Sequence, residues 1–216
     1  SREAIIDFIR WQLPLWRDRP ERPLASAETR LTSQLCAHLN SAARLHTGWD
    51  SFQFRVEEGD ERQLGRSIDL VAAAAGESVV VEGRSYFDFE TILPVECKRL
   101  PTPRSSDRDE REYVATRTGT TGGIQRFKLG LHGATHEQGA MIAYVQDGAL
   151  AQWLSNVQQW IEDMCSIPGW SLHDALISIA HDEQRATALH RSTHVRVSLP
   201  DIRLHHLWID MSARSG

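Results

Sequence analysis

Hydrophobic residues recur at intervals of three and four near the start of the chain. In residues 2–16 they fall at Ile5, Ile6, Ile9, Leu13 and Trp16, which is the spacing of one face of an amphipathic helix, and Pro14 stands near its end. A second stripe follows Ser26 and contains Leu31, Leu35, Cys36 and Leu39. We therefore predict two helices, the first of which packs on the body of the protein.

From Phe52 the period of the pattern changes to two. Apolar residues alternate with polar ones over residues 52–56, and a turn is expected at residues 58–60. Further strand patterns cover residues 67–74, 78–82 and 87–98. This order predicts a meander of strands.

The next segment, residues 101–123, is rich in Pro, Arg, Ser, Asp, Thr and Gly. Such a composition buries little apolar surface, and it predicts a mobile loop. Residues 124–131 have a helical pattern, and residues 140–145 form a continuous apolar run that is typical of a buried strand. A helix followed by a strand indicates a crossover connection.

The last third of the chain combines both periods. We predict a helix over residues 150–165, another within residues 172–189, and two paired strands at residues 194–198 and 204–209. The fold class expected is α/β, or α+β, with a mixed β-sheet flanked by helices. One domain is expected over residues 1–216, made of an N-terminal helix in residues 1–20, a core in residues 24–146 and a C-terminal extension of helix and β-hairpin in residues 150–216.

Composition narrows the class of protein. The 216 residues are 41% hydrophobic and 25% charged, with a net charge of −5, so a full core is expected and any contact with phosphate must be local. Three widely spaced cysteines favour neither a disulfide framework nor a zinc ribbon. The chain has no long apolar run and no secretory signal pattern, so we expect no membrane contact and a cytoplasmic location.

Only two of the 24 basic residues, Lys98 and Lys128, are lysines. Because nearly all other basic residues are arginines, we infer that a lysine is found where a compact ammonium is needed and a planar guanidinium would not fit. Lys98 ends an apolar strand pattern and shares a strand face with Glu96, while Cys97 faces the other way. Asp69 lies inside the preceding apolar strand pattern. These three charged residues are the first catalytic candidates.

Their chemistry is that of metal-assisted hydrolysis. Asp69 and Glu96 could converge as oxygen ligands of Mg²⁺, which uses one or two carboxylates together with waters and substrate phosphate. Such a cation activates a water and neutralises the charge that develops on phosphorus, and a neighbouring ammonium orients the nucleophile. Mn²⁺ should substitute for Mg²⁺.

With Asp69 and the triplet Glu96-Cys97-Lys98, the sequence resembles the PD-(D/E)xK nuclease superfamily, which has a restriction-endonuclease-like fold. The likeness in element order, αβββαβ, covers about residues 24–146, and Ile68 stands where the name-giving proline would be. The resemblance implies a metal-dependent nuclease, with DNA as the expected substrate. It also suggests a module of a bacterial defence or mobile-element system.

The same resemblance implies roles for further residues. Glu28 matches an acid near the metal site of many members, Gln125 matches a glutamine on the helix that follows, and the carbonyl of Cys97 would complete the metal shell. The phosphate backbone would be contacted by basic residues near that helix, which are Arg126, Lys128, Arg99, Arg104, Arg108, Arg111 and Arg117. Acidic residues interrupt the loop, so a basic clamp there is one of two alternatives.

Simpler interpretations of the same residues stay open. Asp69 could be a hydrogen-bonded core acid, and Glu96 with Lys98 an exposed ion pair worth ~0–1 kcal/mol. Glu28 could complement a helix N-terminus, and Gln125 could be an ordinary polar helix residue. The glycines of residues 119–123 lack the Lys-Ser or Lys-Thr of a nucleotide-binding Walker loop.

Histidines and tryptophans of the last third suggest other functions. His190 and His194 have an i, i+4 spacing that could hold zinc, but no glutamate completes an HExxH motif, and scattered solvated histidines are the expected alternative. Trp153 and Trp160 are seven residues apart and should share one face of a helix, in the core or at an oligomer interface.

The sequence thus predicts a Mg²⁺-dependent endodeoxyribonuclease in which Asp69 and Glu96 bind the cation and Lys98 positions the attacking water. A homodimer or a partner protein is expected to supply targeting. Two other functions compete with this one: a nuclease-fold scaffold or nucleic-acid-binding module without catalysis, and a zinc-dependent hydrolase that uses the C-terminal histidines.

Overall fold

The structure is a computed structural model and describes residues 1–59, 67–76, 78–103 and 109–212. The first expected helix is α1, Arg2–Arg17, and it continues through Pro14 to Arg17. The second is α2, Glu28–Leu45. Both predicted helices are confirmed, and each turns its apolar stripe inward, with Ile9 of α1 and Leu35 of α2 fully buried.

The strands form one mixed sheet of seven, in the order β1-β2-β5-β6-β9-β8-β7. Its first half contains β1 (Phe52–Gly59), β2 (Ser67–Ala74), β5 (Thr91–Leu100) and β6 (Gln138–Val145). Its second half contains β9 (Ile202–Asp210), β8 (Thr187–His194) and β7 (Ile177–Asp182). The central neighbours β5, β6 and β9 run parallel, and the outer pairs run antiparallel. A mixed sheet flanked by helices is therefore confirmed.

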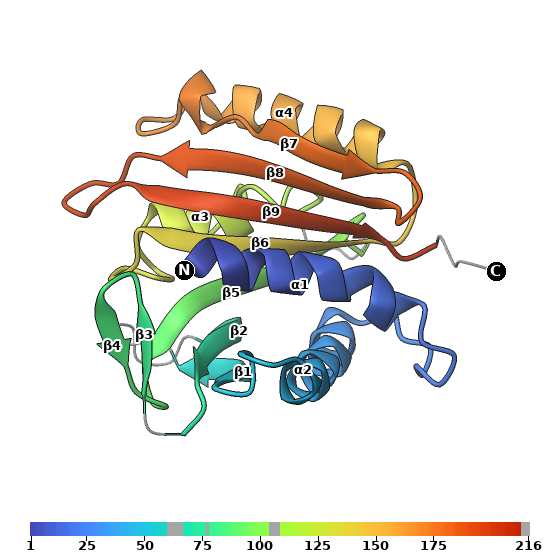
Figure 1. The fold of residues 1–216 in the computed structure, drawn as a ribbon. Helices are drawn as coiled ribbons and strands as arrows, with labels where there is room; N and C mark the ends of the chain where they lie inside the picture. Colours follow the sequence, from blue (N-terminus) through green and yellow to red (C-terminus); the bar gives the residue numbers. More distant parts are fainter. Residues whose placement is uncertain (60–66, 77, 104–108, 213–216) are drawn as a thin grey trace.

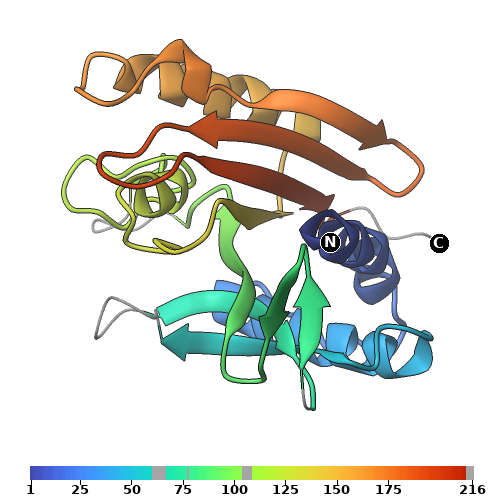
Figure 2. The same cartoon turned by 60° about the vertical axis from the view of Figure 1, so that its left-hand side comes forward.

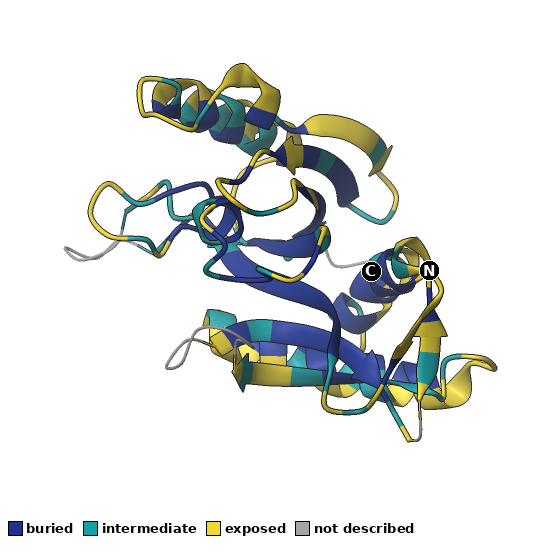
Figure 3. Ribbon diagram, turned by 90° about the vertical axis from the view of Figure 1, so that its left-hand side faces the viewer, coloured by how far each residue is buried: buried dark blue, intermediate teal, exposed yellow. Residues whose placement is uncertain are grey.

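Helices cover both faces of this sheet (Figures 1 and 2). Helices α1 and α2 bury one face, where they pack on Ile142 and Tyr144 of β6. The other face is covered by α3 (Gly123–Lys128) and α4 (Leu150–Met164), which pack on the alternate residues Met141 and Ala143. Successive side chains of β6 thus serve two different cores, which explains its unbroken apolar sequence. In Figure 3 the central strands are buried, whereas the edge strand β7 is largely exposed.

The strand meander differs in one respect from its prediction. The segment expected to add a strand at residues 78–82 instead forms a separate hairpin, β3 (Val79–Val81) with β4 (Arg84–Tyr86). Strand β5 begins only at Thr91. Both short strands have an exposed middle residue and a buried last one, Val81 and Tyr86, so they cover the core instead of extending the main sheet.

Two predictions in the C-terminal third are wrong. Residues 172–189 contain no long helix: a short 3-10 turn, Leu172–Asp174, is followed by β7 and the start of β8. The strand expected to begin at His194 instead ends there. The predicted strand at residues 204–209 is confirmed within β9, which pairs antiparallel with β8. The extension therefore adds three strands to the main sheet.

The expectation of a loop without core residues is also wrong for part of residues 101–123. Tyr113, Val114 and Ala115 are buried and pack on the α3 and α4 side of the sheet. Their backbone supports the helix that follows, because Gly123 N, Ile124 N and Gln125 N donate to carbonyls of residues 112–114. Arg104 and Arg108 lie outside the described residues. None of the described helices is both long and apolar enough to cross a membrane.

Candidate active site

The candidate site forms where the sheet opens between β2 and β5. Pairing of these strands runs from Ala73 opposite Thr91 to Leu70 opposite Val95 and extends no further along β5. Beyond that point two carboxylates accept the backbone N–H groups of β5. Asp69 Oδ2 accepts from Cys97 N at 2.8 Å, and Glu28 Oε2 accepts from Arg99 N at 3.1 Å. Side chains therefore replace a neighbouring strand along this stretch of edge.

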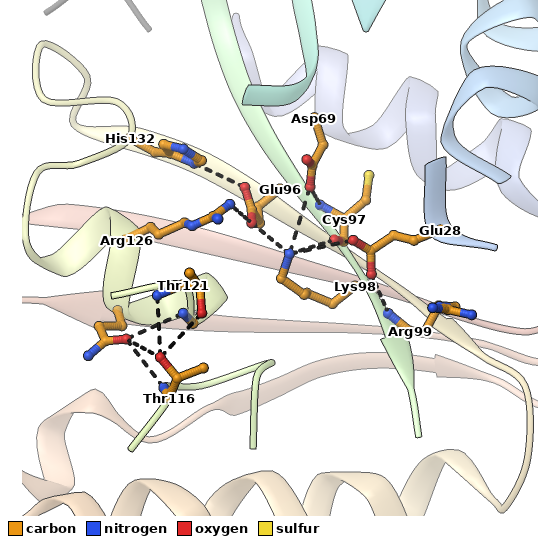
Figure 4. Close-up of polar contacts among 12 residues, drawn as sticks. Glu28, Asp69, Glu96, Cys97, Lys98, Arg99, Thr116, Thr121, Arg126 and His132 are labelled. Atoms are coloured by element: carbon orange, nitrogen blue, oxygen red, sulfur yellow. Dashed lines mark hydrogen bonds and ion pairs between the residues drawn. The ribbon is translucent and has the colours of Figure 1, made fainter. Parts of the chain in front are cut away.

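Lys98 lies between these carboxylates (Figure 4). Its Nζ is 2.8 Å from Glu96 Oε1, 3.6 Å from Glu28 Oε1 and 4.0 Å from Asp69 Oδ2. It also donates to the carbonyl oxygen of Cys97 at 3.2 Å. The side chain is only 6% exposed, so the ion pair with Glu96 is not the exposed surface pair that the simpler interpretation describes. Asp69, Glu96, Lys98 and Glu28 thus form one group, which we call the acid-lysine cluster.

Glu96 is the most deeply buried acid of the cluster. Arg126 Nη1 donates to its Oε1 at 2.7 Å, and His132 Nδ1 lies 3.0 Å from its Oε2 without the alignment of a hydrogen bond. Burial alone would raise the pKa of Glu96, but the charge of Lys98, together with His132 and Arg126, outweighs it and lowers the pKa to about 2. Glu96 is therefore ionised at every pH at which the protein would work.

Lys98 and Asp69 respond to the same cluster in different ways. Burial would lower the pKa of Lys98, but the carboxylates of Glu96 and Glu28 around it raise that pKa above its usual value. Burial raises the pKa of Asp69 to about 7, and the nearby charge of Glu96 adds to this increase. Lys98 is thus a fixed ammonium, and Asp69 is an acid whose ionised form lacks sufficient positive charge nearby.

Replacing Asp69 by asparagine should stabilise the protein at pH 8 when no divalent cation is present. Because the folded state holds the Asp69 proton up to about pH 7 and the unfolded state loses it near pH 4, wild-type stability falls as the pH rises between these values. Asparagine carries no charge and keeps an oxygen for Cys97 N. We expect a gain of about 1–2 kcal/mol, discounted because the side chain is 27% exposed.

The measurement is chemical denaturation in EDTA at pH 4.5 and pH 8. The gain should be much smaller at the lower pH, because the folded protein keeps the Asp69 proton there and the unfolded chain is close to the pH at which it also binds it. Asp50→Asn, at an exposed position on another surface, is the matched control and should show no such dependence. A destabilised Asp69→Asn protein at pH 8 would contradict the raised pKa.

The other predicted site residues lie at different distances from the cluster. Arg126 reaches it directly through Glu96, and the guanidinium of Arg99 donates to Ser26 O at 3.0 Å. Gln125 does not join the cluster: its Oε1 lies 3.3 Å from the donors Thr116 N and Gly122 N, and it supports the loop before α3. Arg117 is exposed, and its N–H donates to Asp109.

Lys128 faces away from the acid-lysine cluster. It is 7% exposed, and its Nζ donates to Asp174 Oδ1 at 2.6 Å. The second lysine of the chain is thus also a buried partner of a carboxylate. Sequence reasoning missed His132, which lies 3.0 Å from Glu96 although 36 residues separate the two in the sequence. No local pattern distinguishes this histidine from the nine others.

The C-terminal histidines form a different arrangement from the one expected. His190, His194, His205 and His206 are buried in β8 and β9, so the prediction of solvated histidines is wrong for them, whereas His173 and His181 are exposed. His194 and His206 both bond to Ser192 Oγ, at 2.7 and 2.8 Å. Since His190 and His194 are four residues apart on a strand, they are roughly 13 Å apart along it and not on adjacent helical turns.

This histidine network continues in both directions. His194 Nδ1 is 2.7 Å from Asp174 Oδ1, and His206 Nδ1 is 2.7 Å from the hydroxyl of Tyr113, which accepts from Trp208 Nε1. Asp174, His194 and Ser192 have the connectivity of a hydrolytic triad, but Ser192 is 2% exposed and its hydroxyl is also held by His206. The network is therefore structural. The predicted pair Trp153 and Trp160 does share a face of α4, with ring centroids 6.1 Å apart.

The donor atoms of the acid-lysine cluster suit a hard cation. Carboxylate and carbonyl oxygens are the ligands that Mg²⁺ prefers, and it needs only one or two carboxylates from the protein. The described residues hold no group of three or more His, Cys, Asp and Glu side chains arranged around a common metal position, and the acids converge on Lys98 Nζ instead. Burial and the nearby charge of Glu96 raise the pKa of Asp69, and a cation bound beside it would stabilise its ionised form.

Comparisons with protein-family models, with curated proteins and with solved structures give no match for this chain.

Proposed function

We propose that the protein is a metal-dependent nuclease that hydrolyses phosphodiester bonds, with DNA as its substrate. The observation that carries the proposal is a buried lysine surrounded by three carboxylates at the place where β5 extends beyond its pairing with β2. A purely structural ion pair needs one acid, as Lys128 has in Asp174. With Asp69 ionised, the three acids carry one more charge than Lys98 and Arg126 balance, and a bound cation would neutralise it.

The residues of the acid-lysine cluster have different roles in this proposal. Asp69, Glu96 and the carbonyl of Cys97 would hold Mg²⁺ or Mn²⁺, with Glu28 at the edge of the set. Bound there, the cation would lower the pKa of a water and neutralise charge on the phosphate. Lys98 keeps its proton, so it acts as a donor that orients the attacking water and stabilises the phosphate, and not as a general base.

Arg126 and His132 have a positioning role in this scheme. Both contact Glu96 and hold its carboxylate in place beside Lys98. The loop after β5 brings Arg117 to the surface near α3, where it can contact the phosphate backbone, whereas the side chain of Arg111 is 16% exposed. The element order α2, β1, β2, β5, α3, β6 supports a restriction-endonuclease-like core, and a targeting partner or a second copy remains part of the proposal.

The test is cleavage of supercoiled plasmid, linear duplex, single-stranded DNA and RNA with Mg²⁺, Mn²⁺ or EDTA. Asp69→Asn is the best inactive variant because we expect it to fold at least as well as the wild type. Cleavage should require the metal and fall by roughly 10²–10³-fold or more in this variant, while Asp50→Asn cuts normally. Equal activity of Asp69→Asn and wild type would exclude the proposal.

A nuclease-fold scaffold that binds nucleic acid without cutting it is the second candidate. The specific observation in its favour is that Asp69 and Glu28 also cap the edge of β5, which is a structural reason to retain them. Metal-independent binding without cleavage of any of the four substrates would favour this scaffold.

A further inference from the structure

A cavity of about 430 Å³ opens on the side of α3 that faces away from the acid-lysine cluster. It lies between α3, the loop at Arg111 to Gly119, the segment after α4 and the turn after β8, and its lining includes Gln125 and Lys128. Pockets that hold small organic ligands have volumes of roughly 300–1,000 Å³. We call it the α3 pocket.

The lining of the α3 pocket combines positive charge with apolar surface. Three cationic side chains, Arg111, Arg117 and Lys128, contribute to it, and none of its lining residues is acidic. Acids behind the lining pair with two of them, since Arg111 lies 3.7 Å from Asp109 and Lys128 lies 2.6 Å from Asp174, so the exposed Arg117 is the cation best placed for a ligand. The apolar part includes exposed side chains that a soluble surface would not ordinarily gather in one place. They are Leu129, Ile167, Val195 and Val197, with exposed fractions of 54%, 47%, 68% and 89%.

An aromatic ring stands beside the buried cation. Trp170 lines the pocket, and Lys128 Nζ lies 5.3 Å from its ring centroid. Asp174 holds that ammonium in place at 2.6 Å, and Asp174 is itself fixed by the N–H of Ser171 and by His194. The ammonium and the ring are therefore held in fixed positions, with the charge of Lys128 balanced by Asp174, and the exposed Arg117 is left to contact the anionic group of a ligand. A planar ring and an anionic group in one ligand would satisfy this lining.

The pocket and the acid-lysine cluster share one short helix. Arg126 of α3 contacts Glu96, while Gln125 and Lys128 line the pocket. A helix is about 10–12 Å across with its side chains. A nucleic acid strand whose phosphodiester lies at the cluster can therefore place a nearby nucleotide in the pocket.

We propose that the α3 pocket binds one unpaired nucleotide of the substrate strand, with its base among Trp170 and the apolar rim and its phosphate near Arg117 and Arg111. This inference rests on the proposed function, because the nucleotide belongs to the same substrate. It selects strands that can release a base from stacking, such as single-stranded ends, flaps or bulges. Unpaired bases are what proteins bind through aromatic surfaces.

The test is binding to the whole chain by isothermal titration calorimetry in EDTA, where no metal-dependent cleavage occurs. The probes are deoxythymidine 5′-phosphate, thymidine, deoxyribose 5-phosphate and decanoate. We expect the nucleotide to bind with a Kd of roughly 10 µM–1 mM and each fragment at least tenfold more weakly. Decanoate that binds more tightly than the nucleotide would overturn the proposal in favour of an acyl ligand.

Surface variants locate the binding. Val197→Asp and Arg117→Gln change exposed pocket residues and should each weaken nucleotide binding by about tenfold or more. Their matched controls, Val80→Asp and Arg44→Gln, alter exposed residues outside the pocket and should bind as the wild type does. Equal affinity of all four variants, or no binding of the nucleotide at millimolar concentration, would overturn the proposal.

Competition with an oligonucleotide tests whether the pocket binds a nucleotide that belongs to a nucleic acid strand or only a free nucleotide. A duplex with one unpaired thymidine should displace deoxythymidine 5′-phosphate, and the same duplex with an abasic position should displace it at least tenfold less well. No difference between the two duplexes would overturn the assignment to a substrate strand. Because these readouts need no cleavage, nucleotide binding without nuclease activity would refute the proposed reaction and leave the pocket standing.

Discussion

Lys98→Met is expected to lose at least about 10³-fold in cleavage rate and, unlike most active-site substitutions, to lose stability as well. The ammonium balances Glu96 and lies within 4.0 Å of Asp69 and Glu28, and methionine fills the volume without the charge. Removing one partner of a buried pair costs roughly 3–5 kcal/mol. Arg126 and His132 still contact Glu96, so we expect the lower part of that range.

The stability of Lys98→Met with and without a divalent cation tests whether the acids around Lys98 bind a metal. If the acids bind Mg²⁺, millimolar Mg²⁺ should restore part of the lost stability of Lys98→Met, because the cation binds only the folded state and replaces the missing charge. The chain offers a matched control in its only other lysine. Lys128→Met also leaves a buried acid, Asp174, but there the cation should restore nothing. Equal restoration in both variants would show that the effect is not specific to the cluster.

The second large effect is expected on acidification: the free energy of unfolding should fall steeply between about pH 6.5 and pH 4. Burial lowers the pKa of His190 to about 4, and it also lowers those of His194 and His206 below their usual value. Asp174 beside His194 opposes this decrease without overcoming it. In this range the unfolded chain takes up protons that the folded protein excludes, so stability present above pH 6.5 is lost as the pH falls.

A substitution of His190 measures the contribution of one histidine to the pH dependence of the free energy of unfolding. Its ring packs against Trp208 with centroids 4.6 Å apart, and neither ring nitrogen has a hydrogen-bond partner among the described residues. His190→Phe should therefore keep the packing and reduce the pH slope by about one proton, which is about 1.4 kcal/mol for each pH unit. Denaturation curves at pH 7, 6 and 5 measure this slope. His173→Phe, at an exposed position, is the control, and an unchanged slope in His190→Phe would contradict the lowered pKa.

The sequence predicted the parts of the fold in which one period dominates. Helices α1, α2 and α4 each carry an unbroken apolar stripe, and β6 and β9 carry apolar runs. A helix was wrongly predicted within residues 172–189 because their apolar positions fit both a helical and a strand period. In the structure they form strands because β7 pairs with β8 and β8 pairs with β9. Tyr113 was missed for another reason, because the short apolar run Tyr113-Val114-Ala115 lies within a long segment that is otherwise rich in polar residues, Pro and Gly.

The candidate site was predictable where residues are close in the sequence. Strand alternation alone places Glu96 beside Lys98, and the structure adds Asp69 and Glu28 at 4.0 and 3.6 Å from Nζ. The convergence of Asp69 and Glu28 on this strand was expected only from the resemblance, and the contacts that depend on α3 were not predictable. The approach of His132 to Glu96 and the capture of Lys128 by Asp174 depend on how α3 packs on the sheet. A basic residue close to a site in sequence can thus be an internal partner and not a phosphate ligand.

Asp69 and Glu28 have two reasons to be retained, the proposed catalysis and the hydrogen bonds that they accept from the open edge of β5. Asp69 and Glu28 accept the N–H groups of Cys97 and Arg99, so a descendant that had abandoned catalysis would still profit from an acceptor at each position. Lys98 and Glu96 are different, because they form a buried ion pair in which the loss of one partner leaves the other unbalanced, whereas apolar residues at both positions would spare the cost of burying two charges. Loss of chemistry in such a lineage should therefore show first as a joint replacement of Glu96 and Lys98.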